Sequence, residues 1–131
     1  MVLGYSGPEG HERALALFDQ AERLSPHDPF LVYWHTNRGM VELFRGNYRR
    51  AIDWADKALK RHPHPLAKRL LASAYAHMGD LARASEMMSE HDRIEPDFTI
   101  EKYRARVGPM FKRDEDLDVF VEGLRLAGAK A

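Results

Sequence analysis

Two segments of the chain, residues 46–52 (GNYRRAI) and residues 79–85 (GDLARAS), carry the same pattern. Each begins with glycine and a small polar residue, continues with a large apolar residue, and places alanine five positions after the glycine. The residue pairs that share the 33-residue offset are Ala51 and Ala84, Gly39 and Ala72, and Pro63 and Pro96. A fixed period of this length predicts an array of repeated structural units.

Each copy is predicted to form two helices. Apolar side chains recur at helical spacing over residues 30–44 and again over residues 48–59, which places them on one face of each helix. A glycine turn separates the two stripes, and Pro63 ends the second because proline cannot continue a helix. The pattern returns over residues 66–78 and 81–94. We therefore predict an all-α chain of short antiparallel helices.

An earlier, partial copy covers residues 12–26, which align with residues 49–63. This alignment makes the first helix the second helix of a unit, so we expect its apolar stripe to lack the cover of a preceding helix. The stripe consists of Ala14, Leu17, Phe18 and Ala21. An open apolar stripe favours association, and we expect a homodimer through this N-terminal end unless residues 2–5 fold back over it.

Residues 97–131 lack the repeated pattern. Asp97 is expected to cap a helix with the stripe Ile100, Tyr103 and Val107. A second helix is expected to carry the stripe Leu117, Phe120, Val121 and Leu124 and to dock on the preceding helix or on the third unit. Terminal units of repeat arrays are usually atypical because one side meets water, so these residues are predicted to form a C-terminal cap.

The repeated segments resemble the tetratricopeptide repeat (TPR), a 34-residue helix–turn–helix unit. The resemblance implies one α-helical domain over residues 1–131, a short helical solenoid with a capping helix pair. Its parts are a half unit at 8–26, units at 32–64 and 65–96 (about two and a half units within 8–96), and the cap at 97–131. The sequence departs from the family at Trp34, which is displaced by one position, at Arg38 in place of leucine, and at His91 in place of a small residue.

In this family the first helix of each unit lines a concave groove that binds a protein or peptide. Carried over by position, the candidates in this chain are Tyr33, Asn37, Met40, Phe44, Arg69, Ser73 and His77. A plain core role for Tyr33, Met40 and Phe44 is an equally good interpretation. Carboxylate clamping is not predicted, because Met40 stands where such a clamp requires asparagine.

A narrower resemblance concerns residues 23–29 (RLSPHDP) and 122–128 (EGLRLAG), which are similar to the C-terminal ends of bacterial class III adenylate/guanylate cyclases. This resemblance implies that the chain is the C-terminal region of a cyclase-like signalling protein. A cyclase catalytic domain of the same parent chain would then be one partner of the repeats.

The composition narrows the remaining classes of function. The 131 residues include 20 basic and 20 acidic side chains and no cysteine. A zero net charge argues against a nucleic-acid or membrane-surface binder, and no segment reads as a signal peptide or a membrane span, so we expect a cytoplasmic protein. Residues 45–69 hold eight basic side chains against two acidic ones, which we interpret as an ordinary solvated face rather than a site for an acidic partner.

No catalytic constellation is present in the sequence, so we expect a non-enzymatic interaction module without a cofactor. The seven histidines are the one compositional oddity, and the His62-x-His64 pair has the ligand type that a metal site needs. We interpret this pair as part of a solvated turn and expect no metal site. The alternatives are an oligomerisation element without a foreign ligand and, less favoured, a small histidine-based metal protein.

Overall fold

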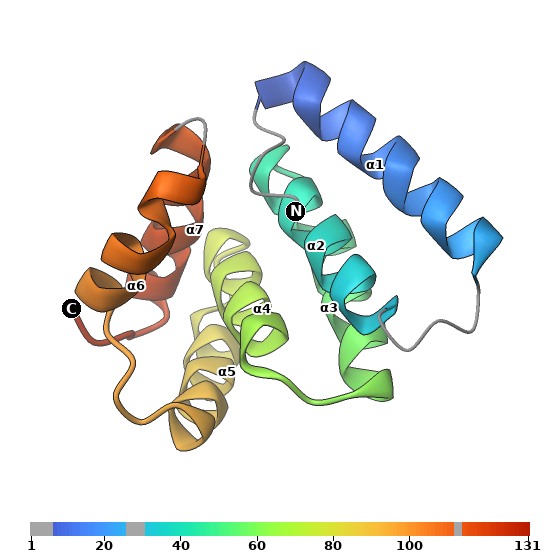
Figure 1. The fold of residues 1–131 in the computed structure, drawn as a ribbon. Helices are drawn as coiled ribbons and strands as arrows, with labels where there is room; N and C mark the ends of the chain where they lie inside the picture. Colours follow the sequence, from blue (N-terminus) through green and yellow to red (C-terminus); the bar gives the residue numbers. More distant parts are fainter. Residues whose placement is uncertain (1–6, 26–30, 112–113) are drawn as a thin grey trace.

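The computed structural model describes residues 7–25, 31–111 and 114–131, and this part of the chain is all-α, as predicted. The helices are α1 (Gly7–Leu24), α2 (Leu31–Phe44), α3 (Tyr48–Arg61), α4 (Pro65–His77), α5 (Leu81–Ile94), α6 (Ile100–Val107), the short 3-10 helix η2 (Gly108–Met110) and α7 (Asp114–Leu126). Figure 1 shows α4 between the α2–α3 hairpin and the α6–α7 segment, with α1 on the outer side of α2.

The two repeated glycines close two equivalent hairpins, α2–α3 and α4–α5. Gly46 has φ +82° and Gly79 has φ +85°, a conformation that side chains other than glycine rarely adopt. In the first turn, Gly46 N donates to Leu43 O and Asn47 N donates to Glu42 O. The second turn repeats both bonds 33 residues later, and this pattern satisfies the last carbonyls of each first helix. The sequence repeat is therefore a structural repeat.

Small residues allow the two helices of a hairpin to approach closely. A Cβ atom built on Gly39 of α2 would lie 3.1 Å from the carbonyl oxygen of Ala51 in α3. Ala51 and its counterpart Ala84 in α5 are both fully buried. The positions that match between the copies are thus the positions at which the helices meet.

Helix α1 packs on α2 within the same chain, which corrects the expectation of an open N-terminal stripe. Ala14 is fully buried and Phe18 is 5% exposed, with its ring edge-on to Trp34 of α2 at a centroid distance of 5.5 Å. Leu17 remains 45% exposed. Helix α2 thus covers part of the stripe, and Leu17 is the stripe residue that remains available for a contact with another chain. Residues 2–5, the other expected cover, lie outside the described part.

The last helix docks on the third unit, one of the two places expected for it. Helix α7 packs mainly against α4 and also touches α2, α5 and α6. Its buried stripe is Leu117, Phe120, Val121 and Leu124. The description of this segment as a cap remains an interpretation.

The cap of α6 is Thr99 and not Asp97, which corrects the expectation from the sequence. The hydroxyl of Thr99 accepts a hydrogen bond from the backbone N–H of Lys102 at 3.2 Å. Both residue types cap helices well. The chain is in a turn at residues 96–97, so the helix begins two residues later than an Asp97 cap requires.

Candidate functional site: the A-helix face

The first helix of each complete unit presents its predicted groove residues along one side. On α2 these residues recur at steps of four, three and four, and on α4 at steps of four, so each set lies on one helix face. We call this surface the A-helix face; it consists of Tyr33, Asn37, Met40 and Phe44 on α2 and of Arg69, Ser73 and His77 on α4. The structure shows that helix α7 lies on this surface, chiefly over α4.

Two of the predicted residues bind the backbone of α7. The Ser73 hydroxyl donates a hydrogen bond to the carbonyl oxygen of Phe120 at 2.9 Å, and Nε2 of His77 donates to that of Val119 at 2.6 Å. Each of these carbonyl oxygens has a second lone pair beside the one used within the helix. The His77 ring also stacks on Tyr48 of α3, with centroids 5.0 Å apart, which holds its orientation.

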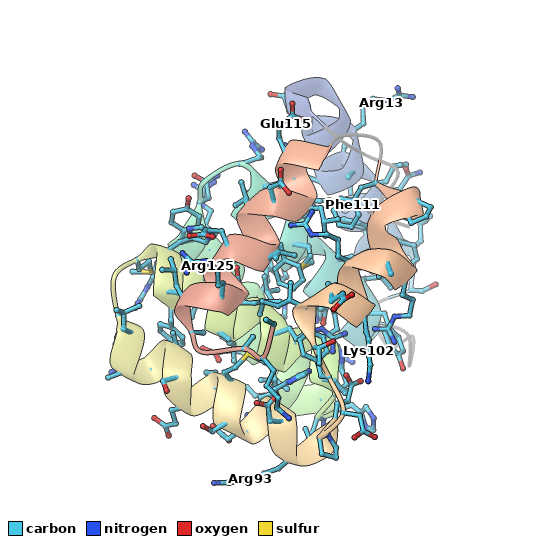
Figure 2. The ribbon with its side chains drawn as sticks, turned by 90° about the vertical axis from the view of Figure 1, so that its left-hand side faces the viewer. Arg13, Arg93, Lys102, Phe111, Glu115 and Arg125 are labelled. Atoms are coloured by element: carbon cyan, nitrogen blue, oxygen red, sulfur yellow. The ribbon has the colours of Figure 1, made fainter. Side chains whose placement is uncertain are left out.

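The side of α7 that faces this surface is apolar and buried. Leu117 and Val121 are 2% and 6% exposed, and Phe120 and Leu124 are not exposed. Burying four such side chains contributes about 6–12 kcal/mol, which is comparable to the roughly 5–15 kcal/mol net stability of a whole domain. Figure 2 views the molecule from the side of α6 and α7 and shows Arg125 on the outward surface of α7.

Gly123 marks the closest approach of α7 to α4. A Cβ atom built there would lie 2.8 Å from the Cα atom of Ser73 and would also overlap its hydroxyl oxygen. Glycine in the middle of a helix costs about 1 kcal/mol relative to alanine. That cost is offset here because only glycine allows α7 to lie this close to Ser73.

The N-terminal end of α7 is tied to α1 and α2. Nε2 of His11 in α1 donates to a carboxylate oxygen of Asp116 at 3.1 Å, and both side chains are buried. Phe111, just before α7, meets Phe44 of the A-helix face edge-on at 5.9 Å. Helix α7 therefore reaches from the third unit to the first helix of the chain.

Arg69 joins a polar cluster with His91 of α5 and with Glu95, which directly follows α5. Its Nη1 atom donates to Nε2 of His91 at 2.9 Å and to the Glu95 carboxylate at 3.0 Å. The Arg69 guanidinium also lies over the rings of Phe98 and Tyr103, at 5.3 and 4.9 Å. Burial lowers the pKa of His91 and raises the pKa of Tyr103. The large His91 side chain thus occupies its unusual position as a neutral acceptor for Arg69.

The remaining predicted residues of the A-helix face lie on α2. Asn37 and Met40 are buried, at 7% and 1% exposure, while Tyr33 is 49% exposed. The Tyr33 ring lies 5.6 Å from the ring of His64. Tyr33 is therefore the accessible end of the A-helix face, while the α4 half is covered by α7.

Residues 36–95 match a family model described as tetratricopeptide repeat. The matched segment is similar to the tetratricopeptide repeat. It begins within α2 and ends just after α5, so it includes most of the two hairpins. A TPR module implies a role in protein interaction and is typically non-catalytic. No curated protein matches the chain.

The histidines that the structure describes mostly join one helix to another. His35 donates from Nε2 to Glu22 of α1 at 2.9 Å, and Nε2 of His64 is hydrogen-bonded to the Thr36 hydroxyl at 2.9 Å. His11, His77 and His91 have the helix-joining roles described above. Within the residues that the structure describes, no three histidine or carboxylate side chains gather as a metal site.

Several basic side chains of residues 45–69 form ion pairs. Lys57 lies 3.6 Å from Glu22, Lys68 lies 3.1 Å from Glu90, and Arg69 is buried beside Glu95. Arg38, which stands where the family has leucine, forms an ion pair with Asp19 and lies over the Trp54 ring at 4.4 Å. None of the described helices is long and apolar enough to cross a membrane.

Two contacts of the site are absent from the sequence predictions: the Gly123–Ser73 approach and the His11–Asp116 pair. A signal for the first is present, because a glycine within the apolar-periodic stretch of residues 117–124 implies a packing reason. The second has no signal in the sequence, because its two residues are 105 positions apart.

Proposed function

We propose that this chain is a non-enzymatic protein-interaction module that binds a protein or peptide through its A-helix face. The observation that carries the proposal is that the face binds a helix within the chain, through hydrogen bonds from Ser73 and His77 and with Phe120 of that helix fully buried. A surface with this shape and these donors suits a peptide ligand.

The absence of a catalytic role is supported by how the titratable side chains are used. His11 is paired with Asp116, His35 with Glu22, and His91 with Arg69. Each of these imidazoles is buried and holds two helices together. A general base must reach a substrate, and a buried imidazole that is held between two helices cannot do so.

Site-specific photocrosslinking in the native cells tests the proposal. A photoreactive amino acid at Tyr33, the exposed end of the A-helix face, is expected to capture a defined protein partner. The control is the same amino acid at Arg83, which is also exposed but lies on α5. Equal capture at both positions, or no adduct at Tyr33, would contradict the proposal.

A second candidate function is an oligomerisation element, with a homodimer formed through the N-terminal end. The observation that favours it is the exposure of Leu17 and Leu24 on α1, at 45% and 75%. Sedimentation of the wild type and of Leu17→Glu tests it, since Leu17 is accessible whereas Phe18 is part of the core. A wild type that sediments as a monomer at high micromolar concentration would remove this candidate.

The cyclase parent remains a proposal that rests on the resemblance of residues 23–29 and 122–128 alone. In that setting the repeats would bind the catalytic domain of the same chain, in the cytoplasm. The coding sequence upstream of Met1 tests the idea directly. A reading frame that continues upstream into a cyclase domain is the expected result, and an in-frame stop codon ahead of Met1 would overturn it.

A further inference from the structure

Helix α7 satisfies every requirement of a ligand for the A-helix face, although it belongs to the same chain. We propose that α7 is an internal ligand, and that the partner of this face is an amphipathic helix with the α7 pattern that binds in exchange for α7. This inference rests on the function proposed above, because it identifies the partner of the same surface.

The first argument comes from burial. The four apolar side chains of α7 cover an apolar surface on α4 and its neighbours, which we call the seat of α7. Exposing this surface to water would cost a free energy comparable to the net stability of a domain. An extended or polar peptide does not replace that burial. The partner must therefore present a continuous apolar helix face of its own.

The second argument comes from the hydrogen bonds. Ser73 and His77 bind carbonyl oxygens of α7 and not its side chains. Every helix offers carbonyl oxygens at the same spacing, so these two donors recognise a helix in the correct register whatever its outward-facing sequence. Two polar donors aimed at a helix backbone fit an exchangeable helix.

The third argument comes from the residues that set the register. Position 123 requires glycine because a Cβ atom there would overlap Ser73. Asp116 supplies the carboxylate to which His11 donates a hydrogen bond. The partner helix is thus expected to begin its pattern with an acidic residue. Counted from that acid, large apolar residues follow one, four and five positions later, a glycine seven positions later and an apolar residue eight positions later. The chain itself shows this pattern at Asp116, Leu117, Phe120, Val121, Gly123 and Leu124.

The test uses the full chain and a fluorescently labelled synthetic peptide of residues 110–131. In the full-chain variant Gly123→Val, the new side chain clashes with Ser73, so α7 is expelled while the surfaces of α1, α2 and α4 keep their sequence. This variant is expected to bind the peptide about tenfold or more tightly than the wild type does, because the seat is open. The matched control is Glu122→Val on the exposed side of α7, which is expected to bind as weakly as the wild type.

A second peptide with valine in place of Gly123 checks that binding uses this seat, and it is expected to bind neither chain. If Gly123→Val loses its fold, melting with and without the first peptide decides the question. A peptide-dependent rise in Tm supports an exchangeable helix, and no rise contradicts it.

The outcome also separates this inference from the function on which it rests. A Gly123→Val chain that binds no peptide, while photocrosslinking at Tyr33 still captures a partner, would overturn the internal ligand and leave the interaction module intact. A failure of crosslinking in both the wild type and Gly123→Val would overturn the interaction module itself.

Discussion

Two kinds of close helix contact in the described part of the chain differ in how they are encoded. In the first hairpin, Gly39 of α2 lies against Ala51 of α3, and the second copy has Ala72 and Ala84 at the same positions. In the other contact, Gly123 of α7 lies against Ser73 of α4, and it occurs once. The first contact is apolar and local along the chain, whereas the second joins distant segments and adds hydrogen bonds. The repeated contact holds each hairpin together, whereas the Gly123–Ser73 contact positions α7 on α4.

The largest effect is expected from truncating the most deeply buried aromatic side chain of α7. Phe120 is fully buried, so Phe120→Ala is expected to lower the free energy of unfolding by about 3–5 kcal/mol. Urea unfolding followed by circular dichroism measures this change. The control is Leu126→Ala on the same helix, where the side chain is 42% exposed.

The comparison between the two contacts would break if Phe120→Ala and Leu126→Ala had equal effects. Helix α7 would then not depend on its apolar face, and the seat on α4 would lose its role in the fold.

A smaller effect is expected inside the repeat. Ala51 is fully buried where α2 and α3 meet, and Ala51→Leu is expected to overpack that contact and cost about 1–3 kcal/mol. Ala84→Leu is expected to cost a similar amount in the second hairpin. The control is Ala82→Leu, on the exposed side of α5, and a tolerated Ala51→Leu would contradict the assigned register of the repeat.

The repeated part of the fold was predictable because its information is local and present twice. The turns at Gly46 and Gly79 share backbone conformation and hydrogen bonds, and one alignment identifies both. The position of α7 was only partly predictable. Its apolar stripe indicated docking on the preceding helix or on the third unit, without choosing between them. Ser73 and His77 bind backbone atoms of α7, and such contacts leave no pattern in its sequence.

For the N-terminal helix, the sequence did not show which element covers its apolar stripe. The stripe on α1 was expected to lack cover within the repeats, whereas the structure buries Ala14 and Phe18 of this stripe and places Phe18 against Trp34 of α2. The Trp34 ring contributes to that cover from α2, where it meets Phe18 edge-on. The Asp97 and Thr99 caps could not be separated because both residue types accept a backbone hydrogen bond.

A third prediction sharpens the comparison at Gly123 itself. Gly123→Ala improves helix propensity by up to about 1 kcal/mol, yet its Cβ atom would lie 2.8 Å from the Cα atom of Ser73. We expect overpacking to exceed the gain and to leave a net loss of about 1 kcal/mol. Thermal melting of Gly123→Ala, and of the same change combined with Ser73→Gly, measures the clash. Partial recovery in the double variant is expected, and a stabilising Gly123→Ala would contradict the close approach.

The smallest effect is expected from pH, and it concerns the histidines that join the helices. Burial lowers the pKa of His35, His64 and His91, so the folded chain favours their neutral forms. A histidine in the unfolded chain has a pKa of about 6.5. As the pH falls below that value, the unfolded chain therefore binds more protons than the folded chain does. The stabilisation is therefore fully present above about pH 6.5 and is lost as the pH falls through the lowered folded values.

Urea unfolding at pH 7.5 and at pH 5.5 is expected to show this loss, at a pH where most free carboxylates are still ionised. His91 gives the clearest test, because Arg69 of α4 and Glu95 both approach its Nε2 atom while Asp92 lies at its Nδ1 atom. His91→Gln keeps an acceptor for Arg69 but cannot titrate, so the difference in unfolding free energy between the two pH values is expected to shrink. An unchanged difference in His91→Gln would mean that the proton is taken up elsewhere, and the buried Arg69–His91 pair would have no part in the pH response.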